Sequence, residues 1–119
     1  MADGDDVRRL ALALPEAVED GTSGAYRVDG KLFAWPWMER LHPGRPRVAN
    51  PEVIAVRVAN EDEKQALMAL DPEIFFTEPH YDGYPAVLVR LPAISPDLLE
   101  KVIADAWRTR APRRLAKGA

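Results

Sequence analysis

Arginines near the end of the sequence are the residues whose type and spacing most clearly suggest chemistry. A guanidinium group presents a planar fork of N–H donors that can pair with two phosphate oxygens at once. The last 13 residues hold five basic residues and no acidic one. The basic residues are Arg108, Arg110, Arg113, Arg114 and Lys117. This tail can bind phosphates, or it can be a solvated helix end whose cations complement the C-terminal helix dipole.

A second group of basic residues lies in the proline-rich segment 38–51, which is predicted to be a long loop. Its arginines are Arg40, Arg45 and Arg47. Loops often carry binding residues, although a polar loop with arginines is also ordinary surface. Lys31, in the strand before this loop, is a further candidate phosphate contact. DNA binding is favoured if the loop and the tail lie on one face of the molecule. It is disfavoured if they lie on opposite faces.

Aromatic residues gather around the pair Asp29-Gly30, which separates two β-rich runs. An Asp-Gly pair in this context predicts a type I′ hairpin turn, because glycine accepts the positive φ that the turn requires. A two-residue loop pairs Val28 with Lys31 and Tyr26 with Phe33, which places four aromatic side chains on one face. They are Tyr26, Phe33, Trp35 and Trp37. Such a face can stack bases, or it can be the core beneath covering helices.

A small ligand pocket is a further candidate site. Its predicted residues are Trp35, Trp37, His80 and Tyr81. His80 and Tyr81 are expected at the rim, where His80 can bind an anion when it is protonated. Glu78 and Asp82 alternate with His80, a spacing that could present ligands to a metal ion, but Pro79 predicts a bend. We therefore predict no metal site.

The sequence shows no recognisable catalytic set. It contains no cysteine, and its few hydroxyl residues have no nucleophile motif around them. Ser95, followed by proline and aspartate, has the pattern of a helix cap. Thr22 and Ser23 lie in a small polar segment that lacks the lysine of a phosphate loop. We predict a protein without enzymatic activity and without a cofactor.

Composition indicates a globular protein of one domain, residues 1–119. The chain has 119 residues, of which 47% are hydrophobic, and a formal net charge of −3. Because the basic residues gather in the tail, the rest of the chain is acidic. No apolar run is long enough to span a membrane, and no signal peptide is recognised at the start. With no cysteine, the cytoplasm is the expected location.

Hydrophobic periodicity and turn residues predict an α+β fold whose antiparallel sheet has about five strands. The predicted order is helix, three strands, helix, two strands, helix. The predicted helices are residues 5–14, 60–70 and 96–110, and the predicted strands are residues 25–28, 31–37, 53–58, 74–77 and 86–91. Residues 111–119 are expected to be a frayed basic tail.

The element order and several short strings resemble the MmcQ/YjbR family of small bacterial proteins. The strings are Leu14-Pro15, residues 28–34, residues 67–72, residues 81–91 and residues 106–112. The resemblance implies an antiparallel sheet of about five strands packed by helices, similar in topology to type III secretion chaperones. It also implies DNA binding through a double-wing arrangement.

Two functional hypotheses follow, and neither involves catalysis. The first is DNA binding through the basic tail and the 40–47 loop. The alternative is a module with no nucleic-acid role that binds a protein or a small ligand, at a groove between the sheet and a helix. In both cases we expect a monomer or weak dimer that has no membrane partner.

Overall fold

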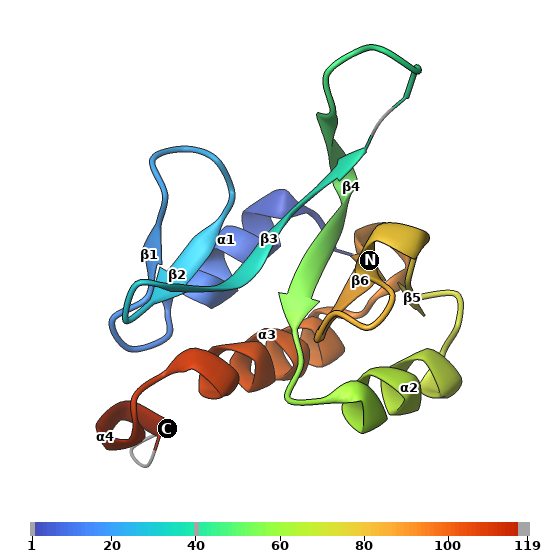
Figure 1. The fold of residues 1–119 in the computed structure, drawn as a ribbon. Coiled ribbons are helices and arrows are strands. Elements are labelled where there is room, and N and C mark those ends of the chain that lie inside the picture. The colour runs from blue at the N-terminus through green and yellow to red at the C-terminus, as the bar shows by residue number, and fades with distance from the viewer. Residues whose placement is uncertain (1, 40, 117–119) are drawn as a thin grey trace.

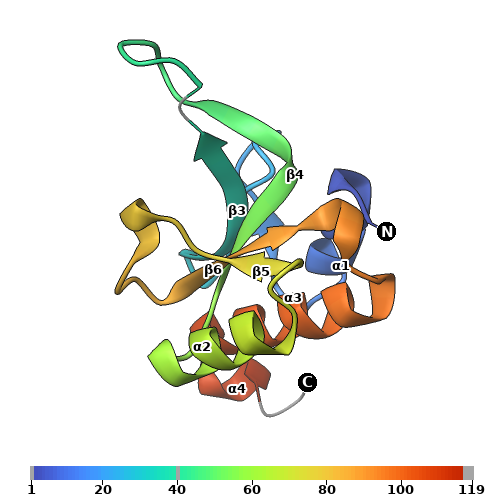
Figure 2. The ribbon, with the colours of Figure 1, turned by 90° about the vertical axis from the view of Figure 1, so that its right-hand side faces the viewer.

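An antiparallel sheet of six strands lies at the centre of the molecule, and helices pack against one of its faces (Figure 1, Figure 2). The computed structural model describes residues 2–39 and 41–116. The strand order in the sheet is β1-β2-β3-β4-β6-β5. The α+β class is confirmed, but the predicted count of five strands is wrong, because a short strand precedes the first hairpin. The strands are β1 (Val18–Glu19), β2 (Tyr26–Val28), β3 (Lys31–Glu39), β4 (Val48–Arg57), β5 (Phe75–Phe76) and β6 (Ala86–Arg90).

Polar caps begin the three longer helices, α1 (Gly4–Leu12), α2 (Glu61–Leu70) and α3 (Pro96–Arg110). Each cap side chain accepts a hydrogen bond from the amide three residues later, which satisfies one free N–H of the first turn. The caps are Asp3, Asn60 and Ser95. Among the described residues, no helix is long and apolar enough to cross a membrane.

Helix α3 ends at Arg110, as predicted, and Pro112 follows two residues later. Part of the tail then forms the short helix α4 (Arg113–Ala116). The rest of the predicted tail, residues 117–119, lies outside the described residues.

The hairpin of β2 and β3 turns at Asp29 and Gly30, whose φ angles are 53° and 72°. Both values are positive, as a type I′ turn requires. The predicted pair of Val28 with Lys31 is confirmed. The predicted pair of Tyr26 with Phe33 is wrong, because Tyr26 pairs with Ala34 and leaves Phe33 as the extra residue of a β-bulge.

This bulge divides the four aromatic side chains that were predicted to share one face. Tyr26 and Phe33 are buried in the core beneath the helices, with exposed fractions of 2% and 0%. Trp35 and Trp37 pack on the opposite face of the sheet. The prediction of one continuous aromatic face is therefore wrong, since one extra residue changes which face the following side chains occupy.

Strands β3 and β4 extend beyond the sheet as a two-stranded arm that ends in the 40–47 loop (Figure 1, Figure 2). Segment 38–51 was predicted to be a loop, which is wrong at both ends because Met38 pairs with Ala49. Pro51 lies inside β4, in an irregular stretch without a pairing partner, where its missing N–H removes no ladder bond.

Two hydrophobic clusters lie on opposite faces of the sheet. The larger one unites the sheet with α1 and α3, and Trp107 at its centre is fully buried. The smaller one consists of Val53, Ala55 and Leu88, against which Trp35, Trp37, Phe76 and Tyr81 pack. Among the described residues no α-helix contributes to this smaller cluster. We call this side of the sheet the aromatic face.

Candidate ligand pocket on the aromatic face

A pocket of about 310 Å³ opens on the aromatic face. Its lining residues are Leu32, Trp35, His80, Tyr81 and Tyr84. The size lies at the lower end of the range for small-molecule sites, roughly 300–1,000 Å³. We call it the aromatic pocket. It unites three of the four predicted pocket residues, because the 3-10 helix η1 (Pro79–Tyr81), which follows β5, brings Tyr81 into contact with Trp35 of β3.

The rings of the aromatic pocket meet edge to face. The ring centroids of Trp35 and Tyr84 are 6.4 Å apart, and those of Tyr81 and Tyr84 are 6.0 Å apart. His80 meets Tyr81 at 5.7 Å. Across the sheet Trp35 pairs with Ala55, whose small side chain leaves space for the indole ring. In each T-shaped contact the edge of one ring meets the face of its neighbour, so the rings together form an aromatic lining that can contact a planar ligand.

Polar groups at the edge of the pocket can orient such a ligand. Trp35 Nε1 donates to the Tyr81 hydroxyl at 3.1 Å. Since this oxygen has no acceptor among the described residues, its own proton can be donated to a ligand. The Arg57 guanidinium lies 5.4 Å from the centre of the Tyr84 ring, and its Nη1 is 3.4 Å from the Tyr84 hydroxyl. His80 is exposed beside these groups, so the polar edge favours an acceptor or an anion.

Trp37, the fourth predicted pocket residue, does not line the pocket. It packs edge to face on Phe76, with 5.8 Å between ring centroids. Its Nε1 is buried and has no hydrogen-bond partner among the described residues. Trp37 therefore contributes packing to the aromatic face rather than a wall of the pocket.

Lys64 holds the segment that closes the pocket. Its side chain is buried, with 1% of the residue exposed, although it belongs to helix α2. Nζ donates to the backbone carbonyls of Tyr81 at 2.6 Å and Tyr84 at 3.0 Å. Two charge-assisted hydrogen bonds thus join α2 to both tyrosines of the pocket.

Two of the four arginines predicted to bind phosphate in the tail are paired within the chain. Arg108 donates to Asp105 at 3.0 Å, and Arg114 donates to both carboxylate oxygens of Glu16 at 2.8 and 3.2 Å. The hydrogen bonds from Arg114 hold the pKa of the Glu16 carboxyl below its usual range. Arg110 is half-buried, with its Nε shielded from solvent. Arg113 is exposed and has no recorded partner within the part of the chain described.

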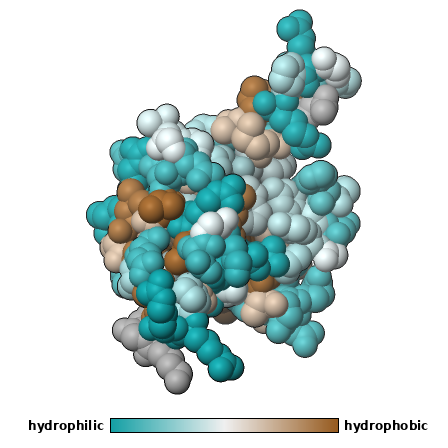
Figure 3. Space-filling view, turned by 60° about the vertical axis from the view of Figure 1, so that its left-hand side comes forward, coloured by the Kyte–Doolittle hydropathy of each residue, from teal (hydrophilic) through white to brown (hydrophobic). Residues whose placement is uncertain are grey.

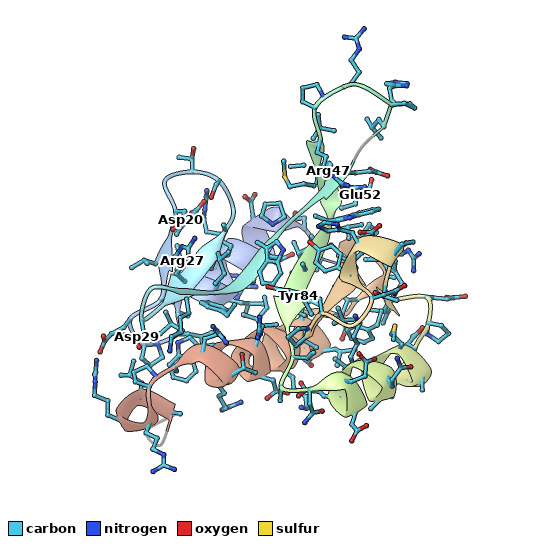
Figure 4. All side chains as sticks on the ribbon, in the orientation of Figure 1. Asp20, Arg27, Asp29, Arg47, Glu52 and Tyr84 are labelled. Carbon is cyan, nitrogen blue, oxygen red and sulfur yellow. The ribbon has the colours of Figure 1, made fainter. Side chains whose placement is uncertain are left out.

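The arm residues lie far from this tail. Arg45 and Arg47 are exposed, and Arg47 Nη1 donates to the carbonyl of Met38 at 3.0 Å. Figure 4 places Arg47 on the arm and Tyr84 in the body of the molecule. Lys31 is exposed at the first position of β3, and Arg40 lies outside the described residues. The arm and α4 occupy opposite ends of the molecule (Figure 1, Figure 2), so the structure does not bring the two arginine groups together.

Among the described residues, the acidic side chains near the pocket form no metal site. In residues 2–39 and 41–116, no three or more His, Cys, Asp or Glu side chains are grouped as metal ligands.

Figure 3 shows a side of the molecule that is mostly hydrophilic, with small, separate hydrophobic patches and the arm projecting from the body.

Comparison with known proteins identifies the family. A family model described as YjbR matches residues 12–109, which is most of the chain. The chain belongs to the YjbR family. The matched range contains the whole aromatic pocket and Lys64, whereas Arg110, Arg113 and Arg114 lie beyond its end.

Proteins similar to this chain occur in mycobacteria. One protein of Mycobacterium bovis and two of Mycobacterium tuberculosis strains are each 40% identical to this chain over 123 residues. The match covers 98% of this chain and 95% of each relative. All three are described as uncharacterized proteins, so they carry no assigned activity. No solved structure matches the chain.

Sequence reasoning on this YjbR-family chain missed three residues of the site. Leu32 and Tyr84 complete the pocket lining, and Lys64 supports it. Lys64 lies three and four positions before Leu67 and Met68, both of which pack against the core. A lysine on the buried side of a helix is a signal that could have identified it, since a fully buried lysine needs hydrogen-bond acceptors.

Proposed function

We propose that this YjbR-family protein is a non-enzymatic binding protein whose aromatic pocket takes up a small ligand with a planar ring and an anionic or hydrogen-bond-accepting group. The observation that carries the proposal is the convergence of Trp35, Tyr81 and Tyr84 on one pocket, with polar donors at its edge. Stacking surfaces with a few placed donors are typical of small-molecule sites. We further propose that the protein acts in the cytoplasm, as a monomer or a weak dimer.

The ring requirement can be tested with two anions that differ in planarity. The ¹⁵N-labelled protein is titrated with 2-naphthoate and with its fully saturated decahydro analogue, while amide signals are followed by NMR. We expect saturable shifts at residues 32–35 and 80–84 with naphthoate, and roughly two- to tenfold weaker binding of the saturated anion, since stacking contributes about 0.5–1.5 kcal/mol. Equal affinities, or shifts confined to other residues, would contradict the proposal.

Nucleic-acid binding is a second candidate function, and one observation favours it. The projecting arm carries the exposed arginines Arg45 and Arg47, in the manner of a wing that can reach a phosphate backbone. The tail offers little support, since Arg108 and Arg114 are ion-paired at the opposite end of the molecule.

Salt dependence tests this second candidate. If the two described arm arginines each neutralise one phosphate of duplex DNA, the logarithm of affinity falls with that of salt concentration with a slope of about −1.8. Replacing both by alanine should remove this dependence, whereas Arg113→Ala should not change it. Binding that is absent, or that depends on Arg113 and not on the arm, would exclude an arm-based interface.

A further inference from the structure

A second, larger groove lies at the other side of α2, between α2, α3 and the end of β4. Its volume is about 650 Å³. Val56, Val58 and Val102 line it and are at most 5% exposed, while Leu67 and Leu98 are partly exposed on the two helices. None of these residues belongs to the aromatic pocket. We call it the α2–α3 groove.

Helix α2 is held to the body of the molecule by its buried side only, and its other side borders the groove. Lys64 is the one buried residue of α2. Leu70, which also lines the groove, is 65% exposed. An apolar occupant would cover this side chain and the adjoining valines, and the removal of this apolar surface from water would stabilise the complex.

Charges at the rim favour an anion. Both carboxylates that line the groove already accept hydrogen bonds within the chain. Glu63 accepts from the amide of Ala59 at 3.0 Å, and the two oxygens of Asp105 accept from Lys101 at 2.7 Å and Arg108 at 3.0 Å. Lys101 and Arg108 each have further N–H donors, because an ammonium carries three and a guanidinium five.

A third cation strengthens this preference. Arg57 also lines the groove, and its recorded partner is the neutral hydroxyl of Tyr84. The rim therefore carries three cations against two carboxylates, both of which already accept hydrogen bonds within the chain, while the floor is apolar. This combination complements a molecule with an apolar chain and one anionic end.

We propose that the α2–α3 groove binds a free alkyl-chain carboxylate, with the chain along Val56, Leu67 and Leu98 and the carboxylate beside Lys101 and Arg108. The volume is ample for such a chain, since sites of this kind span roughly 300–1,000 Å³. The proposal does not depend on the function of the aromatic pocket.

Two amphiphiles of equal chain length and opposite charge test the proposal. Dodecanoate and dodecyltrimethylammonium are titrated into the full chain below their micelle concentrations, by calorimetry and by NMR of the valine and leucine methyl groups. Dodecanoate should bind about tenfold more tightly and shift the methyl signals of the groove. The double variant Lys101→Gln, Arg108→Gln should lose this preference, whereas Arg113→Gln, outside the groove, should keep it.

A pair of substitutions on α2 tests the location. Ala66 is exposed and lines the groove, so Ala66→Phe fills the groove without removing a core side chain. Ala69 is exposed on the same helix outside the lining, so Ala69→Phe is the matched control. We expect Ala66→Phe to reduce dodecanoate affinity about tenfold and Ala69→Phe to leave it within twofold.

Each other occupant gives a distinct result that overturns the proposal. Equal binding of the two amphiphiles would show adventitious apolar binding only. Binding to phosphatidylglycerol vesicles without binding of free dodecanoate would assign the groove to a membrane surface. Dimerisation in sedimentation experiments that Ala66→Phe abolishes, again without dodecanoate binding, would assign it to a second copy of the chain.

Discussion

The Nζ atom of Lys64 lies 2.6 Å from the backbone carbonyl oxygen of Tyr81, and this contact fixes the closing segment of the aromatic pocket to helix α2. The same carbonyl also accepts from the amide of Tyr84 at 3.0 Å. A buried cation thus completes a small hydrogen-bond network beneath the pocket, and the position of α2 determines the position of both tyrosines.

Removing this cation should loosen the pocket. Lys64→Met keeps an unbranched side chain in the buried site but removes both hydrogen bonds, and we expect a loss of about 1–3 kcal/mol in unfolding free energy. Amide hydrogen exchange at Tyr84 and Ala86, measured by NMR, should accelerate, and naphthoate affinity should fall. Gln65→Met, at an exposed position of the same helix that lines neither pocket, is the control. Unchanged exchange in Lys64→Met would show that the segment holds its conformation without the lysine.

The indole N–H of Trp107 should contribute to stability, unlike that of Trp37. Trp107 Nε1 donates to the carbonyl of Pro15 at 3.0 Å, and this hydrogen bond joins α3 to the segment that follows α1. Trp37 Nε1 has no such partner among the described residues. In urea unfolding we expect Trp107→Phe to cost about 2–3 kcal/mol, through a lost hydrogen bond and a cavity, and Trp37→Phe distinctly less. Equal costs would refute the role of the Pro15 hydrogen bond.

Acid should remove a stabilising contribution of Glu19. Hydrogen bonds from Arg8, with a smaller contribution from the Gly24 amide, outweigh burial and hold the pKa of the Glu19 carboxyl below its usual range. A lowered pKa in the folded state stabilises the protein above the unfolded value of about 4.3, and this stabilisation disappears as the pH falls through the folded value.

Melting temperatures of the wild type and Glu19→Gln between pH 7 and pH 3 measure this effect. The difference should be largest above about pH 5 and should vanish at the acid end. Glu100→Gln, at an exposed position of α3, should show no comparable trend. A Glu19→Gln difference that is the same at every pH would mean that ionisation of this carboxyl is not involved.

Local signals in the sequence predict much of the fold. The Ser95 cap, the Asp29-Gly30 turn and the end of the last long helix at residue 110 depend on neighbours within a few residues, and the structure contains all of them. The spacing of hydrophobic residues, which is also a local property, predicts whether each longer element is a helix or a strand.

Features that depend on distant contacts could not be predicted in this way. The bulge at Phe33 is set by how β3 pairs with β2, and the residue types around it do not mark the position of an extra residue. Strand β1 has two residues, too few for a periodic pattern. Trp35, His80 and Tyr81 were recognised as candidate pocket residues by their residue types. The roles of Tyr84 and of the buried Lys64 could not be recognised, because they depend on the path of the 77–85 segment.

The most direct test of the aromatic pocket compares two tryptophans on the same face of the sheet. Trp35 lines the pocket and Trp37 does not, so Trp35→Leu and Trp37→Leu form a matched pair. Calorimetric titration with 2-naphthoate, on variants whose folding is verified by circular dichroism, should show about tenfold weaker binding for Trp35→Leu. Trp37→Leu should bind within twofold of the wild type. Equal losses in the two variants, or no loss in either, would contradict a binding site in the aromatic pocket.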